Sequence, residues 1–246
     1  MWRWFERRKT DPTVFHVTHP KAGSQWVYDV LAQVAGPRIV APMVGVAHVL
    51  ETPIRPGCVY PTVYLTRRQL DAVAVPGRAI RFVVIRDLRD TLVSLYFSKR
   101  YSHSLITAQL VDDRKLLATQ NAQQGLRFCL AERFDPGARI QKSWLDGPDP
   151  VFRYEDLIRD PLQGFRQIFD LCGIELSTRK LERVVKNASF ENRSGRTLGT
   201  EDVESHLRRG LPGDWVNHFD EALKADFKKL YGPLLVRADY ERDESW

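Results

Sequence analysis

Apolar residues change from strand spacing to helix spacing several times along the chain. Residues 14–18 alternate apolar and polar side chains, as a half-buried strand does, and apolar residues then recur at helical spacing from Trp26 to Val34. Strands that alternate with helices predict an α/β fold with a central, mainly parallel sheet flanked by helices. The predicted strands cover residues 14–18, 38–44, 63–65, 79–85 and 150–154.

The predicted helices are separated by stretches rich in glycine, proline and polar residues, which favour turns and loops. A Pro-rich long loop is predicted over residues 45–61, a break at Asp135-Pro136-Gly137 and a flexible segment over 190–213. No internal repeat or linker divides the chain, so we expect an N-terminal arm over 1–12 and one domain over 13–246. The predicted helices cover residues 26–34, 67–75, 92–100, 108–133, 155–171, 176–188 and 214–231.

The chain is basic, with a formal net charge of +6 and a pI near 9.3. This balance favours an anionic ligand. Nucleic acid is not expected, because no basic run is interleaved with aromatic residues. Three widely spaced cysteines show neither metal-site nor disulfide spacing. They favour a reducing compartment, and we expect a cytoplasmic protein without a metal.

The first residues combine tryptophan with basic side chains but lack the apolar core of a signal peptide. No apolar run approaches the eighteen or so residues of a transmembrane helix, so no integral membrane segment is expected. Two interpretations of Trp2 and Trp4 stay open. They could make weak contact with an anionic membrane surface, or dock on this domain or on a partner chain, which leaves a homo-oligomer open.

A short loop, His19 to Gln25, joins the first predicted strand to the first predicted helix. A strand, a tight loop and a helix N-terminus form an anion site, because free backbone N–H groups and the helix dipole point at one spot. Lys21 adds a positive charge, Gly23 allows close backbone approach, and Ser24 adds a helix cap or a ligand-facing hydroxyl. The alternative is a solvated Lys21 and a merely capping Ser24. The GxxxxGK(S/T) pattern of ATP and GTP sites is absent.

Two further strand ends carry polar residues, and ligands of parallel sheets collect at these ends. Arg86 follows the strongly apolar strand 79–85, and Ser94 lies two turns into the next helix. Together they can grip one phosphate from two sides. The alternative for Arg86 is a salt bridge to Asp87 or Asp90. Tyr154 ends the last predicted strand.

Four stretches together resemble the signature motifs of the sulfotransferases that use 3′-phosphoadenosine 5′-phosphosulfate (PAPS). They occur in the family's order and cover the chain from about Phe15 to Phe219. The resemblance implies a single α/β domain of P-loop-NTPase-like architecture. The stretches are Pro20-Lys21-Ala22-Gly23-Ser24-Gln25-Trp26, the run from Ile85 to Tyr96, Arg153-Tyr154-Glu155-Asp156-Leu157 with Asp160-Pro161, and Arg208-Arg209-Gly210-Leu211-Pro212-Gly213-Asp214-Trp215.

The resemblance implies transfer of a sulfuryl group from PAPS, with 3′-phosphoadenosine 5′-phosphate (PAP) as the product. The acceptor would be a hydroxyl or amine of a small molecule or carbohydrate, and no metal is required. Lys21 would neutralise the bridging oxygen as the S–O bond breaks. The implied binding residues are Lys21, Ala22, Gly23, Ser24 and Gln25 for the 5′-phosphosulfate, Trp26 and Tyr154 for the adenine, and Arg86, Ser94, Arg208, Arg209 and Gly210 for the 3′-phosphate.

The general base is the main departure from the family pattern. Many cytosolic members carry Lys-Thr-His in the region that corresponds to residues 60–66, where this chain has neither Lys nor His. A base must reach the acceptor hydroxyl. His48 and Glu51 are the nearest candidates by position, and His103 is a third. Smaller departures are Ala22, Gln25 and Leu88, which replace Ser, Thr and Pro.

Two other functions stay open at this level. One is a P-loop-type phosphotransferase using ATP, although the sequence shows no obvious set of Mg²⁺-binding carboxylates. The other is a non-catalytic nucleotide-binding protein of the same fold, which the missing Lys-Thr-His motif keeps open.

Overall fold

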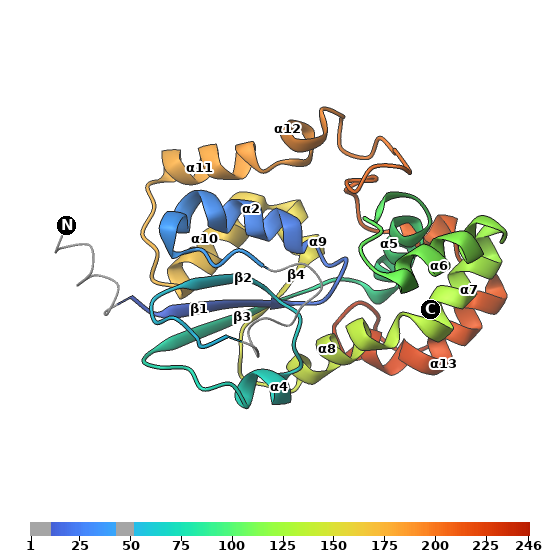
Figure 1. The fold of residues 1–246 in the computed structure, drawn as a ribbon, viewed down its shortest axis with the longest axis horizontal. Helices are drawn as coiled ribbons and strands as arrows, with labels where there is room; N and C mark the ends of the chain where they lie inside the picture. Colours follow the sequence, from blue (N-terminus) through green and yellow to red (C-terminus); the bar gives the residue numbers. More distant parts are fainter. Residues whose placement is uncertain (1–10, 43–51) are drawn as a thin grey trace. The chain divides into compact units, whose positions relative to one another are not determined.

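The computed structural model describes residues 11–42 and 52–246 of the chain. Within this part, four parallel strands form one sheet in the order β2-β1-β3-β4 (Figure 1). The predicted α/β fold with a parallel sheet is therefore confirmed. The strands are β1 (Thr13–Thr18), β2 (Val59–Val63), β3 (Ala79–Ile85) and β4 (Val151–Arg153).

The chain divides into two compact units, each made of two stretches. The first contains the residues up to Ile85 together with Arg139–Arg193, and it holds the whole sheet. The second contains Arg86–Ala138 and Ser194–Trp246. The predicted division into an arm over 1–12 and one domain over 13–246 stays a prediction.

Helices make up most of the rest of both units. The first unit holds α2 (Ser24–Ala35), a 3₁₀ turn (Gly36–Arg38), α4 (Arg67–Asp71), α9 (Tyr154–Arg159), α10 (Pro161–Leu171) and α11 (Thr178–Asn187). The second holds α5 (Leu88–Phe97), a π-helical turn (Ser98–Ser102), α6 (Ala108–Ala118), α7 (Ala122–Glu132), a 3₁₀ turn (Asp214–Asn217) and α13 (Glu221–Arg237). The boundary between the units falls within α8 (Asp135–Leu145) and α12 (Phe190–Ser194).

The core of the first unit lies between one face of the sheet and the helices α2, α10 and α11 (Figure 1). Val14 and Val84 from the sheet pack with Leu31 of α2 and Phe165 of α10, and all four are buried. Because the strands are parallel, their carboxyl ends lie at one edge of the sheet, where the loop after β1 begins. The core therefore fixes the position of that loop.

The edge strand β2 begins earlier in the chain than the predicted strand 63–65, and the strand predicted over 38–44 does not form in its described part. Residues 38–44 were predicted as a strand, but the described part of this stretch contains the end of a 3₁₀ turn and one isolated bridge from Ile39 to Val59. β2 includes Pro61; it begins within the predicted Pro-rich loop over 45–61 and ends at Val63, the first residue of the predicted strand 63–65. Proline cannot donate to a ladder, but β2 is an edge strand, where proline is tolerated.

Two proline-containing turns also differ from the prediction. Asp135-Pro136-Gly137 was predicted as a break, but these residues begin α8, because the first helical turn needs no proline N–H. The predicted helix over 155–171 is instead interrupted at Asp160. The Asp160 carboxylate accepts the N–H of Gln163, and Pro161 starts α10.

A histidine lies in the middle of the sheet. His16 in β1 is fully buried, and its ring stacks on Phe82 with the ring centroids 5.0 Å apart. Its Nδ1 atom lies 2.5 Å from the Pro61 carbonyl oxygen, which can only accept, so Nδ1 carries a proton. Burial lowers the pKa of His16 to about 4, against a smaller opposing effect of this hydrogen bond. The ring is therefore neutral at pH 7.

We predict that His16 makes the stability of the protein depend on pH. The group titrates near 6.5 when unfolded and near 4 when folded, so the unfolded chain takes up the proton first as the pH falls. The free energy of unfolding should therefore fall between pH 6.5 and pH 4, by on the order of 3 kcal/mol from this residue. Urea unfolding of the wild type and His16→Gln across this range measures the effect. The variant should show a flatter pH dependence, and an unchanged slope would contradict the assignment.

Candidate active site

The loop between β1 and α2 has an unusual backbone. Lys21 adopts a left-handed conformation with φ 73°, and Gly23 has φ 86°. A left-handed residue other than glycine costs of order 1 kcal/mol and occurs preferentially at functional sites. The Ala22 N–H donates to the His19 carbonyl at 3.2 Å, which closes the turn. Lys21 therefore lies in the turn that leads into the N-terminus of α2, and its role in an anion site stays a prediction.

Gly23 is required by its surroundings as well as by its backbone angle. A Cβ atom at this position would lie 2.6 Å from Cδ2 and 2.7 Å from Cε2 of Tyr154. Tyr154 is buried, and the half-buried Trp26 meets it edge-on with the centroids 6.0 Å apart. Trp26 also meets Phe165 edge-on at 5.0 Å. The ring of Tyr154 therefore packs against the loop at Gly23. The adenine roles of Trp26 and Tyr154 stay predictions.

Ser24 is the first residue of α2 and does not cap it. The N-cap is Gly23, and no side chain caps the helix. The Ser24 hydroxyl instead lies 2.7 Å from the hydroxyl of Tyr64, which follows β2. The capping alternative for Ser24 is therefore wrong. Sequence reasoning missed Tyr64 because no spacing pattern connects two residues forty positions apart.

In the second unit, Arg86 lies next to a buried carboxylate. Its Nη2 atom is 3.8 Å from Oδ2 of Asp90, so the ion pair expected as an alternative does form. Asp90 also accepts the backbone N–H groups of Gly213, at 2.6 Å, and Trp215, at 3.0 Å. Burial raises the pKa of Asp90, while Arg86 and the two N–H groups oppose that rise. Asp90 thus ties the 208–215 motif to the start of α5.

A second buried carboxylate, Asp214, gathers the basic residues of that motif. It accepts hydrogen bonds from both Arg208 and Arg209, and from His218 Nε2 at 3.1 Å. Burial alone would raise the pKa of Asp214, but these bonds and one from Asn217 outweigh it, and the pKa lies far below its ordinary value. Asp214 is therefore charged and balances two arginines at once.

Arg208 and Arg209 differ in their contacts within the protein and in the exposed fraction of their side chains. Arg208 also pairs with Glu201, and its guanidinium lies 4.3 Å from the ring centroid of Phe97. Its side chain is 12% exposed, against 33% for Arg209. Arg209 is thus the more accessible donor for an anion. Arg208 makes more contacts within the protein, with Glu201, Asp214 and Phe97.

Arg89 belongs to the same motif as Arg86 but has a structural role. It bonds to Asp87 and Glu241, with closest distances of 2.7 and 2.5 Å. Its guanidinium carbon lies 4.0 Å from the ring centroid of Trp215 and 4.4 Å from that of Trp246. The sequence gives no sign of this arrangement, because Glu241, Trp215 and Trp246 lie more than a hundred residues away.

The predicted cofactor residues fall into two groups, one in each unit. Lys21 to Trp26 and Tyr154 belong to the first, and Arg86, Ser94 and Arg208 to Gly210 belong to the second. The proposed bases His48 and Glu51 lie outside the described residues. The third candidate, His103, uses its main chain to end the π-helical turn, since its N–H donates to Ser98 and its carbonyl accepts from Arg114.

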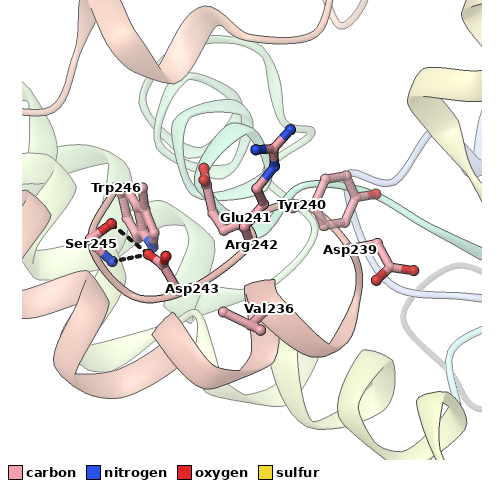
Figure 2. A pocket seen from close by; sticks show the side chains of 8 residues that line it. All are labelled: Val236, Asp239, Tyr240, Glu241, Arg242, Asp243, Ser245 and Trp246. Carbon is pink, nitrogen blue, oxygen red and sulfur yellow. Dashed lines mark hydrogen bonds between the residues drawn. The ribbon is translucent and has the colours of Figure 1, made fainter.

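A cavity of about 740 Å³ lies beside the C-terminal residues, and Figure 2 labels the side chains between Val236 and Trp246 that line it. At its edge, Ser245 donates its N–H and its hydroxyl to Asp243, at 2.7 and 2.5 Å (Figure 2). Its volume would suit a small ligand. None of the residues predicted for the cofactor lines it, so it is not the predicted cofactor site.

Within residues 11–42 and 52–246, the structure contains neither a metal-binding cluster nor a membrane-spanning helix. No group of three His, Cys, Asp or Glu side chains there is arranged to hold a metal ion. No helix in the same part of the chain combines the length and apolar character needed to cross a bilayer. The three cysteines, Cys58, Cys129 and Cys172, are buried and free.

The parallel sheet flanked by helices, with a tight loop between β1 and α2, has the predicted P-loop-like architecture. A family model described as sulfotransferase domain matches residues 81–239, more than half of the chain. The chain therefore belongs to the sulfotransferase domain family. This confirms the resemblance inferred from the four motifs and the predicted class of enzyme, a sulfotransferase.

Individual relatives show how far the similarity extends. Human sulfotransferase 1C2 is 26% identical over 169 residues, which are 60% of this chain and 52%, about half, of the human protein. The 3-alpha-hydroxysteroid sulfotransferase of Cavia porcellus is 24% identical over 250 residues, 90% of this chain and 83% of that protein. The crystal structure of mouse sulfotransferase SULT7A1 complexed with PAP has a TM-score of 0.67 at 18% identity, over 96% of this chain and 90% of that chain. It shows the same fold.

We predict that Gly23→Ala destabilises the protein more than Gly77→Ala. Both positions have positive φ, but an added Cβ meets Tyr154 at Gly23 and nothing within 4 Å at Gly77. Gly77→Ala should lower the free energy of unfolding by about 1 kcal/mol, and Gly23→Ala by roughly 2–4 kcal/mol, since the tyrosine must also move. Urea unfolding measures both. Equal losses would contradict the close contact.

We predict that Asp214→Asn lowers the free energy of unfolding at pH 7 by about 2–3 kcal/mol, because two arginines lose their shared charge partner. The folded pKa of Asp214 lies below its unfolded value, so its contribution is present above pH 3.8 and is lost as the pH falls further. The difference from the wild type should therefore shrink at pH 3. The exposed Asp226→Asn serves as the control. A deficit that is the same at both pH values would refute this role.

Proposed function

We propose that the protein transfers the sulfuryl group of PAPS to a hydroxyl group of a small, largely apolar acceptor. The acceptor oxygen attacks sulfur, the S–O bond to the 5′-phosphate breaks, and PAP leaves. The proton of the acceptor hydroxyl passes to a base, for which Glu51 and His48 remain the candidates. The observation that carries the proposal is the pair of basic groups, one around Lys21 and one around Asp214, because PAP carries two separate phosphates.

The loop around Lys21 suits the end of the donor where charge develops. When the S–O bond breaks, negative charge builds up on the departing phosphate oxygen. The Lys21 ammonium and the backbone N–H groups at the start of α2 supply opposite charge without an added metal. We assign Ala22, Gly23, Ser24 and Gln25 to this end of the donor, and Trp26 and Tyr154 to the adenine.

The group around Asp214 suits the 3′-phosphate. Arg86, Ser94, Arg208, Arg209 and the backbone at Gly210 are the binding residues we assign to it. Arginine binds phosphate with paired N–H donors, and a guanidinium already held by a carboxylate loses little freedom on binding. Arg209 is expected to contribute more direct binding than Arg208, since it is more exposed.

The apolar acceptor is supported by two observations. Leu105 and Ile106, which follow the π-helical turn after α5, are 47% and 50% exposed. Contiguous exposed apolar surface marks binding sites, and these two side chains are neighbours in the chain. The matched relative from Cavia porcellus is named for hydroxysteroids, which are apolar molecules with a hydroxyl group. A carbohydrate acceptor fits these side chains less well.

We also propose that the protein works in the cytoplasm, which the three buried free thiols support. Homo-oligomer formation and weak membrane contact of the N-terminal arm stay predictions, because residues 1–10 lie outside the described part.

Calorimetric titration with PAP, ADP and AMP tests the cofactor assignment. PAP should bind at least about tenfold more tightly than AMP, since it adds charge-assisted hydrogen bonds to its 3′-phosphate. Arg86→Ala should remove most of that difference and leave AMP binding nearly unchanged. Arg159→Ala, which removes an arginine that is 75% exposed, is the control. Equal binding of ADP and PAP, unaffected by Arg86→Ala, would instead favour an ATP-using phosphotransferase.

A further inference from the structure

Tyr64 lies beside the anion loop because of the sheet register. Val63, the last residue of β2, pairs with Val17 of β1, so the next residue of each strand emerges at the same edge. From there β1 continues into the loop that carries Lys21, while β2 continues into Tyr64. The phenol oxygen reaches Ser24 Oγ at 2.7 Å, a normal hydrogen-bond length between hydroxyl groups.

The chemistry of the two hydroxyl groups sets the direction of this bond. A phenol is a better proton donor than an aliphatic alcohol, so the favoured arrangement has Tyr64 donating to Ser24. Tyr64 is 39% exposed as a residue, but the surroundings of its hydroxyl are buried. This burial raises the pKa of Tyr64, and the hydrogen bond with Ser24 opposes the rise only in part. The phenol thus keeps its proton at neutral pH. With Tyr64 as donor, the Ser24 proton is directed away from the phenol.

We propose that Tyr64 is a positioning residue that holds the Ser24 hydroxyl as a donor toward the anion bound by the Lys21 loop. This inference rests on the proposed function, because the anion is taken to be the 5′-phosphate or phosphosulfate of the nucleotide. Ser24 does not cap α2, and as the first residue of the helix it has no helical carbonyl four residues earlier to bond. The tyrosine therefore replaces the usual local partners of a helical serine.

The contact between Tyr64 and Ser24 lies just after β2, in the region where the Lys-Thr-His motif of the family is missing. Tyr64 lies within residues 60–66, the region that lacks both Lys and His. A phenol with a raised pKa is a poor proton acceptor at neutral pH, so Tyr64 is not the general base. Its contribution is to ligand binding at the loop, and its loss should affect the affinity for the nucleotide.

A double-mutant cycle tests whether Tyr64 acts through Ser24. The four proteins are the wild type, Tyr64→Phe, Ser24→Ala and the double variant, and the probes are PAP and ADP, which share the 5′-phosphate. Tyr64→Phe should weaken binding of both nucleotides about three- to tenfold in the wild-type background. In the Ser24→Ala background it should have no further effect. Tyr28→Phe removes a hydroxyl from the same helix as Ser24 and should leave binding unchanged.

The outcomes separate this inference from the cofactor assignment. A loss of affinity that is the same with and without Ser24, or no loss at all, would overturn the role of Tyr64. If PAP and ADP bind the wild type equally well, the 3′-phosphate assignment fails, yet the cycle still reports on Tyr64 through ADP. Absence of binding of either nucleotide by the wild type would overturn both.

Discussion

Positively charged side chains that gather to bind a phosphate repel one another before the phosphate arrives. In this protein two buried carboxylates offset the charge of the arginines that we propose as ligands of the 3′-phosphate. Asp214 accepts hydrogen bonds from Arg208 and Arg209 together, and Asp90 lies beside Arg86 while it holds two backbone N–H groups of the same motif. The carboxylates lower the repulsion and fix the arginines in place, so that binding an anion requires little further ordering. The basic motif near the C-terminus depends on this arrangement.

The other basic group is organised by backbone geometry. Lys21 is held in a left-handed conformation, and the ring of Tyr154 lies so close to Gly23 that no side chain fits there. These two features set the shape of the loop. Ser24 completes it through Tyr64, which comes from the neighbouring strand. Together these contacts give the loop a defined shape without the usual ATP-site glycine pattern, which supports the proposed anion site.

The parts of the fold that local patterns determine could be predicted from the sequence. The strands over 14–18 and 79–85 and the loop at Lys21 have clear spacing and were predicted correctly. The edge strand β2 was misplaced because Pro61 suggested a loop, and only the position at the sheet edge makes that proline acceptable. The motif residue Asp214 was noticed only as part of a resemblance. Its role as a shared partner of two arginines, like the bond between Tyr64 and Ser24, depends on contacts that no local pattern encodes.

Hydrogen–deuterium exchange with and without PAP tests the central claim most directly, because it shows which backbone segments a bound nucleotide protects. The account predicts slower exchange over residues 19–27 and over 208–215 when PAP is bound, and slower exchange over 19–27 alone with AMP. The segment around the C-terminal cavity, 236–246, should be unaffected by either nucleotide. Protection confined to that segment, or the same pattern with PAP and AMP, would contradict the assignment of two separate phosphate sites.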